Sequence, residues 1–119
     1  MIKLVTLIKR KPGVSLDAFK RHEETRHVVL TKKIMGDDLL DYVRNYPVAD
    51  DLVRFGADND YDAIIECTFA DRAAFERAIA ATNRPENRAL FKADYEQYLD
   101  LASVRQSVVE VRTRMDGVY

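Results

Sequence analysis

The sequence FKRHEETRHVVL, residues 19–30, lies in the strongest helical pattern of the chain and holds both of its histidines. One face of this pattern recurs at steps of three and four: Leu16, Phe19, Glu23, His27, Leu30 and Ile34. Such spacing predicts one amphipathic helix, which Ser15 can cap and Gly36 can end. Histidine is the side chain that titrates closest to neutral pH. Proton chemistry, if the chain performs it, is therefore expected on this helix first.

Segments with strand and helix patterns surround this helix. Strands are predicted at residues 2–9, 40–48, 61–69 and 104–113, and further helices at residues 72–81 and 86–99. The order β-α-β-β-α(α)-β is that of the ferredoxin-like α+β fold, in which helices cover one face of an antiparallel four-stranded sheet. A chain of 119 residues suits one domain, so we expect residues 1–119 to form a single unit. The polar, aspartate-rich stretch at residues 49–60 is predicted to be a solvated loop.

Composition excludes several function classes. The net charge of −1 disfavours a nucleic acid or an acidic membrane as partner, and no apolar run is long enough to span a bilayer. The apolar N-terminus lacks the flanks of a signal peptide. Cys67 is the single cysteine, so an internal disulfide cannot form, and no Cys/His cluster suits zinc. We expect a cytoplasmic protein in which Cys67 is a buried small hydrophobe.

The fold leaves one sheet face without helices, and the strand patterns suggest what lies there. Residues 61–69 alternate, so Ala63, Ile65 and Cys67 suit the helices, while Asp62, Ile64, Glu66 and Thr68 take the other face. We expect the polar and aromatic face of residues 42–46 to join that open face, carrying Tyr42, Arg44 and Tyr46. A second subunit would then close a cavity rich in proton donors and acceptors.

Several segments, taken in order, are similar to those of one known family. Residues 2–15 with Phe19 resemble its first strand and helix start, and RHVVL at residues 26–30 resembles its His-Ala-Pro-Leu box, with Val29 in place of proline. Residues 42–46 resemble its second strand. YDAIIECTF at residues 61–69 is similar to its Tyr-Asp-Gly-x-x-Glu-x-x-Phe strand, with Ala63 in place of glycine. Asp94 and Tyr98 resemble its acidic and aromatic positions before the last strand. The chain thus resembles the EthD-like family of dimeric α+β barrel proteins.

This resemblance implies a homodimer whose two sheets pack into a barrel, with a small-molecule pocket between sheet and helices in each subunit. Chemistry among such proteins includes isomerisation, polyketide cyclisation, dehydration and decarboxylation, so architecture is implied more firmly than reaction. It favours a place for His27 in the pocket, as general acid and base or as a hydrogen-bond donor to a substrate carbonyl. We also expect Phe19, Asp94 and Tyr98 to contribute to substrate binding.

The residues themselves leave two interpretations of the histidines open. His27 lies on the apolar stripe and is either a hydrogen-bonded core histidine or a pocket acid and base. His22 lies five residues earlier, which on an ideal α-helix is about 140° away, so it is expected at the rim or outside the site. This spacing also suits a metal poorly, and no metal site is expected.

The sheet supplies the other candidates. Glu66 and Asp62 share a strand face, where one of them is either a base with a raised pKa or half of an ion pair with Arg44 or another cation. Tyr46 or Tyr42 either holds a developing oxyanion or packs at an interface. We expect His27, Tyr46 and Glu66 to be catalytic. Substrate contacts are expected from Tyr42, Arg44, Asp62 and Ile64.

These residues favour a cofactor-free lyase, isomerase or cyclase that moves a proton on a small oxygenated ring compound, aromatic, lactone or polyketide-like. No nucleotide fingerprint or phosphate loop is present, and no cofactor is expected. One alternative is a non-catalytic ligand-binding protein of a degradation or biosynthetic operon. Another is a haem-binding or monooxygenase relative in which His27 is an axial ligand.

Overall fold

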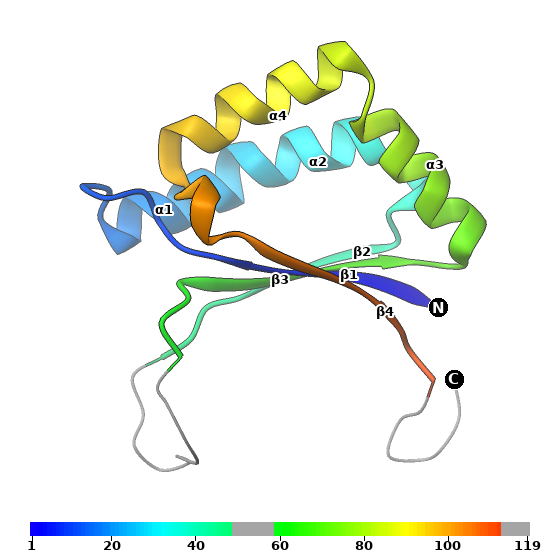
Figure 1. Cartoon of the computed structure of the whole chain (residues 1–119), viewed down its shortest axis with the longest axis horizontal. Coiled ribbons are helices and arrows are strands. Elements are labelled where there is room, and N and C mark those ends of the chain that lie inside the picture. The colour runs from blue at the N-terminus through cyan, green and yellow to red at the C-terminus, as the bar shows by residue number, and fades with distance from the viewer. Residues whose placement is uncertain (49–58, 113–119) are drawn as a thin grey trace.

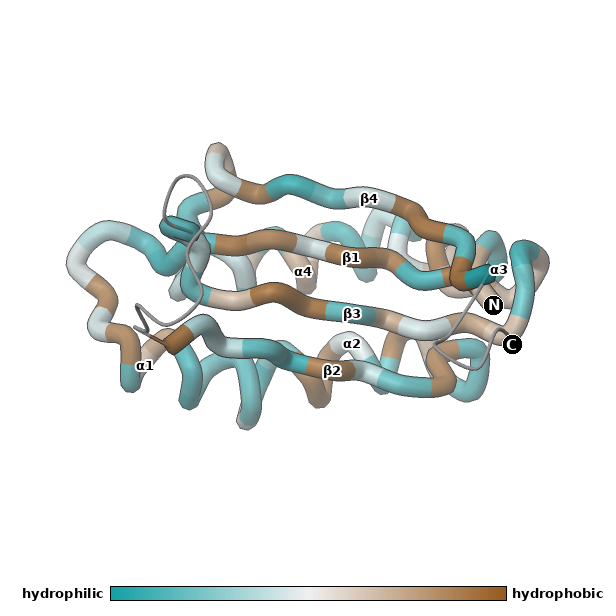
Figure 2. Tube along the Cα trace, turned by 90° about the horizontal axis from the view of Figure 1, so that it is seen from below, coloured by the Kyte–Doolittle hydropathy of each residue, from teal (hydrophilic) through white to brown (hydrophobic). Residues whose placement is uncertain are grey.

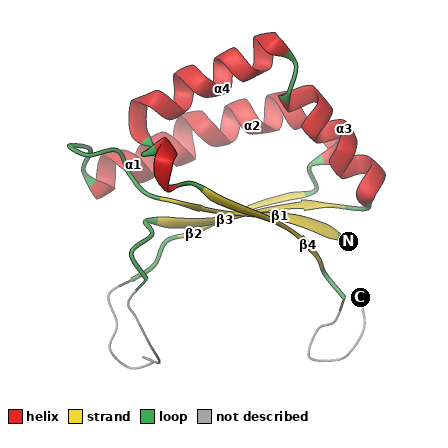
Figure 3. Cartoon of the chain, in the orientation of Figure 1, coloured by secondary structure: helices red, strands yellow, loops and turns green. Residues whose placement is uncertain are grey.

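The computed structural model of the chain describes residues 1–48 and 59–112. Its order of elements matches the predicted one (Figures 1 and 3). The strands are β1 Ile2–Ile8, β2 Asp41–Asn45, β3 Ala63–Phe69 and β4 Arg105–Glu110. The helices are α1 Leu16–His22, a π-helix Glu23–His27, α2 Val28–Met35, α3 Arg72–Thr82 and α4 Pro85–Tyr98, with 3-10 turns at Gly36–Asp38 and Leu101–Ser103. Most of the aspartate-rich loop and the C-terminal tail lie outside the described residues.

The strands form one antiparallel sheet in the order β2-β3-β1-β4. The helices all lie on one face of it, as Figure 1 shows. This confirms the ferredoxin-like α+β arrangement. No helix within the described ranges is long and apolar enough to cross a membrane.

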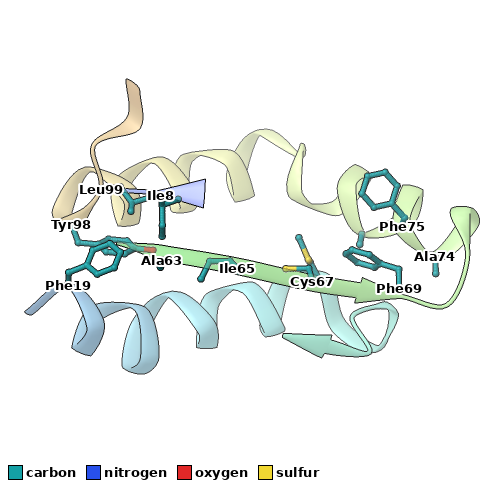
Figure 4. Packing of buried hydrophobic residues seen from close by; sticks show 12 residues of the cluster. Ile8, Phe19, Ala63, Ile65, Cys67, Phe69, Ala74, Phe75, Tyr98 and Leu99 are labelled. Atoms are coloured by element: carbon teal, nitrogen blue, oxygen red, sulfur yellow. The ribbon is translucent and has the colours of Figure 1, made fainter. Parts of the chain in front are cut away.

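The core lies between β3 and the helices. Figure 4 shows Phe69 and Phe75 at one end of β3 and Phe19 with Tyr98 at the other. Phe69 meets Phe75 edge-on with ring centroids 5.4 Å apart. Burying each such ring contributes roughly 1.5–3 kcal/mol, which fixes the helices on the sheet. Cys67 lies in this core, as expected.

The long first helix differs from prediction, because it contains a π-helical turn. The Val28 backbone N–H donates to the Glu23 carbonyl, five residues back. Buried positions therefore run at steps of four: Phe19, Glu23, His27, Thr31 and Met35. The predicted stripe through Leu30 and Ile34 is only half-buried. On a regular α-helix, positions four residues apart rotate progressively around the helix axis. The wider π-helical turn offsets this rotation, so the buried residues stay on one face.

Strand register also corrects the expected sheet faces. Tyr42 pairs with Cys67 and Arg44 with Ile65, so both point toward the helices. Glu66 instead pairs with Val5 and Val43, on the open face. The expectation that Tyr42 and Arg44 share a face with Glu66 and Ile64 is therefore wrong, since a shift of one residue inverts every side chain of a strand.

Figure 2 looks onto the open face, with the helices behind the sheet. Its side chains mix apolar and polar groups: Lys3, Val5, Leu7, Asp41, Val43, Asn45, Ile64, Glu66, Thr68, Arg105, Ser107 and Val109. Val5 lies near its centre, between Glu66 and Ser107 on the neighbouring strands.

Candidate active site

A cavity of about 860 Å³ lies between the sheet and the helices. Its floor is largely apolar and comes from three strands: Leu4 and Thr6 of β1, Ile65 and Cys67 of β3, and Gln106 and Val108 of β4. The π-helix contributes His27 and α2 contributes Thr31. Phe91 and Tyr95 come from α4. The volume lies within the range of small-molecule pockets.

His27 lines this cavity. Its Nδ1 lies 2.8 Å from Oδ2 of Asp94 on α4. A carboxylate only accepts hydrogen bonds, so Nδ1 carries the proton and Nε2 keeps a lone pair in the neutral ring. Thr31 Oγ1 lies 3.3 Å from Nε2, but its hydroxyl already donates to the His27 carbonyl at 2.9 Å. Thr31 can therefore accept a hydrogen bond from Nε2 once that nitrogen is protonated.

His22 binds the other oxygen of the same carboxylate. Its Nε2 lies 2.7 Å from Asp94 Oδ1. His22 does not line the cavity, and its expected place at the rim stays a prediction. Its contact with Asp94 was not predicted, and it arises because the π-helical turn brings residues five apart toward one face. Burial raises the pKa of Asp94, but hydrogen bonds from His27 and His22 outweigh burial and hold it below its ordinary value. Asp94 is thus an ionised acceptor that fixes both imidazole rings.

Aromatic rings surround His27, which is only 8% exposed. Ring centroids lie at 5.2 Å for Tyr95, 5.9 Å for Phe91 and Tyr98, and 6.4 Å for Tyr42. These rings exclude water, and electron-rich ring faces favour a positive charge beside them. The His27 ring is therefore packed among aromatic side chains.

Glu23 is an acid that lines the cavity and has no exposed surface. Its Oε1 accepts a short hydrogen bond from the Tyr42 hydroxyl, and its Oε2 accepts one from Tyr98 at 2.6 Å. Burial raises the pKa of both phenols, and the negative charge of Glu23 adds to this. Both hydroxyls therefore remain donors to Glu23. The role expected for Tyr42, holding a substrate oxyanion, would require it to break this bond.

Sequence reasoning gave no role to Glu23, although it placed this residue on the buried helical face. Its step of four from His27 was the available signal. Thr31 and Tyr95 were missed as well, Thr31 because the predicted stripe passed through Leu30 instead.

Glu66 lies away from this site, on the open sheet face. Its carboxylate bonds Lys3 at 3.3 Å and Asn45 at 3.0 Å. The hydrogen bond from Asn45, aided by Lys3, holds the pKa of Glu66 below its ordinary value. The interpretation as a base with a raised pKa is wrong, and the ion-pair alternative is confirmed with Lys3 as the cation. Ile64 shares the open face and does not line the cavity.

The remaining predicted residues lie around the cavity rather than on its lining. The Asp62 carboxylate accepts the Arg10 backbone N–H at 2.7 Å. Phe19 is fully buried against Tyr98, with ring centroids 5.5 Å apart. Both residues thus support the fold.

Arg44 and Tyr46 face the helices but lie beside the cavity too. The Arg44 guanidinium lies 5.5 Å from the Tyr42 ring centre, and Lys20 lies 5.1 Å from that of Tyr46. Burial raises the pKa of Tyr46 to about 12, with Glu24 and Glu23 adding to it. Neither Arg44 nor Tyr46 lines the cavity itself.

Within residues 1–48 and 59–112, no group of three His, Cys, Asp or Glu side chains is arranged to hold a metal ion. Asp94 instead accepts hydrogen bonds from both histidines.

Comparisons with known proteins agree with this fold. A family model described as the EthD domain matches residues 11–102. An EthD-like protein from Ralstonia eutropha is 20% identical, with 97% of this chain and 96% of that chain covered and a TM-score of 0.69. SnoaB from Streptomyces nogalater, a cofactor-independent oxygenase, is 13% identical, with 96% and 95% covered and a TM-score of 0.60.

A dimeric ferredoxin-like protein of unknown function from Thermobifida fusca is 17% identical, with 92% and 90% covered and a TM-score of 0.54. At these identities the likenesses show the fold. No match was found among curated proteins.

Proposed function

Because the chain belongs to the EthD family, we propose that its cavity binds a small oxygenated ring compound and that His27 moves a proton on it without a cofactor. The ring is aromatic, lactone or polyketide-like, and the reaction is an isomerisation, cyclisation or elimination. The observation that carries this proposal is the 2.8 Å contact between His27 Nδ1 and Asp94, which leaves Nε2 as the base.

The mechanism follows from the proton positions. His27 Nε2 takes a proton from a carbon next to a carbonyl group, and the C–H electron pair forms an enolate. Asp94 stabilises the resulting imidazolium through Nδ1–H, while Thr31 accepts from Nε2–H. Imidazolium then returns the proton to another carbon or to a leaving group. His22 keeps Asp94 in place by binding its second oxygen.

Two features support this reading. The cavity is largely apolar, which strengthens electrostatic interactions inside it and suits a ring compound. SnoaB is described as a cofactor-independent oxygenase, so one protein of this fold performs chemistry without a cofactor. An oxygenase reaction differs from the proposed isomerisation, cyclisation or elimination, so the support from SnoaB is limited to catalysis without a cofactor.

The protein is further proposed to be a homodimer joined through the open sheet face. That face carries Val5, Leu7 and Val43 between polar groups and has no helix over it. The Thermobifida fusca protein of similar fold is described as dimeric. A second sheet would bury these apolar side chains.

Exchange in D2O tests the acid–base role without knowledge of the natural substrate. The protein is incubated with a panel of cyclic ketones, lactones and phenolic polyketide analogues, and NMR follows loss of C–H signals next to carbonyl groups. We expect exchange on at least one compound, and a loss of about 10²-fold or more in His27→Gln. Arg26→Gln, an exposed neighbour on the same turn, should leave the rate unchanged.

Equal exchange rates in His27→Gln and native protein would refute the assignment of His27. If panel compounds bind but none exchanges, the non-catalytic binding protein is the better description.

A further inference from the structure

A third phenol of the cavity, Tyr95, is left without a role by the proposed mechanism. Building on that proposed function, we infer that the Tyr95 hydroxyl binds the substrate's carbonyl oxygen while His27 takes the neighbouring proton. The substrate class is then narrowed to compounds that present a neutral carbonyl or phenolic oxygen to the cavity interior.

Tyr95 has the position that this role requires. Its ring is the nearest of the aromatic rings around His27, with centroids 5.2 Å apart. It follows Asp94 directly on α4, so the same turn of helix carries Tyr95 and the carboxylate that binds His27. Phe91, one turn earlier, stacks on the Tyr95 ring at 5.8 Å and restricts its orientation.

The hydroxyls of the other tyrosines around His27 already donate hydrogen bonds. Tyr42 and Tyr98 both donate to Glu23. Tyr95 lines the cavity, and within residues 1–48 and 59–112 no hydrogen bond engages its hydroxyl. A phenol hydroxyl carries one hydrogen to donate, and a ligand oxygen in the cavity can accept it.

Charges near Tyr95 keep it a donor. Burial raises the pKa of its hydroxyl, and the negative charges of Glu23 and Asp94 raise it further. The phenol therefore stays protonated and leaves the base role to His27. The same negative charges disfavour an anionic group deep in the cavity, which is why a neutral oxygen is expected there.

The step balances without another reactant. The C–H bond breaks, its proton moves to His27 Nε2, and its electron pair becomes the carbon–carbon π bond of an enolate. The enolate oxygen accepts the Tyr95 O–H hydrogen bond, and Tyr95 keeps its proton. The imidazolium that forms in the same step offsets the new negative charge.

A binding cycle tests this inference without measuring turnover. Dissociation constants of 2-naphthol and of naphthalene, which lacks the oxygen, are measured by fluorescence for native protein, Tyr95→Phe and Tyr61→Phe. Tyr61 is a matched control, because it loses the same oxygen outside the cavity lining. In native protein and Tyr61→Phe we expect naphthol to bind more tightly than naphthalene. In Tyr95→Phe this preference should fall by roughly two- to tenfold, the size of one hydrogen bond.

An unchanged naphthol preference in Tyr95→Phe would overturn the inference, as would failure of both compounds to bind native protein. The result is separable from the test of His27, because the cycle measures affinity and the exchange assay measures proton transfer. Exchange could be lost in His27→Gln while Tyr95→Phe keeps its preference for naphthol. That combination would support the proposed function and refute the role inferred for Tyr95.

Discussion

The Tyr98 hydroxyl donates to Glu23 Oε2 at 2.6 Å, across 75 residues of sequence. This bond joins the end of α4 to the π-helical turn, and neither residue is more than 1% exposed. Tyr98→Phe would leave one oxygen of a buried carboxylate unpaired. We expect the free energy of unfolding to fall by about 1–3 kcal/mol, measured by urea denaturation.

Tyr61→Phe serves as the control for this loss and should change stability by less than about 0.5 kcal/mol. Equal stability of Tyr98→Phe and Tyr61→Phe would show that the Glu23 contact contributes nothing to the fold.

Asp94 should make stability depend on pH at the acidic end. Burial raises the pKa of Asp94, but its hydrogen bonds to His27 and His22 bring it below its ordinary value. The folded state therefore favours the carboxylate. This contribution is complete above the unfolded pKa of about 3.9 and is lost as pH falls through the lower folded pKa.

Asp94→Asn should accordingly be less stable than native protein at pH 7. The difference should shrink as the pH falls below about 4, when measured by urea denaturation at several pH values. A difference that stays constant down to pH 2 would contradict the assigned role of the carboxylate.

Cys67 should be inert in the folded protein. Burial raises the pKa of its thiol to about 12, and Glu23 adds to this. The thiolate is the reactive form, so a disulfide reagent at pH 8 should label Cys67 only as fast as the protein opens. Rapid labelling with an unchanged circular dichroism spectrum would contradict the burial of this side chain.

The proposed dimer makes a separate prediction about Val5, near the centre of the open sheet face. Val5→Asp would place a charge in the interface, so ultracentrifugation should find a dimer for native protein and a monomer for the variant. Val29→Asp is the control, because Val29 is 59% exposed on α2, and it should remain dimeric. A monomeric native protein would refute the interface.

The fold was largely predictable because its strongest signals are local. The alternation through Ala63, Ile65, Cys67 and Phe69 marks a strand with one buried face, and the order of elements leaves few topologies. The sequence predicted both His27 and Asp94 as site residues, and this stays a prediction. Their direct contact was not predicted, because no local pattern reports a contact between α4 and the first helix.

Two failures have physical causes. The second strand alternates Tyr42, Arg44 and Tyr46 with Asp41, Val43 and Asn45, and neither set is apolar enough to identify the buried face. The π-helical turn is equally hidden, since an i→i+5 hydrogen bond leaves the residue types unchanged. That one turn decides whether His22 meets Asp94 or stands apart.

The most direct test of the acid–base site is the position of the proton on the neutral His27 ring. With 15N-labelled histidine, long-range proton–nitrogen NMR spectra distinguish a protonated Nδ1 from a protonated Nε2. We expect the neutral ring to carry its proton on Nδ1, held by Asp94, with the lone pair on Nε2. A neutral His27 with its proton on Nε2 would contradict the account, because no base would then face the cavity.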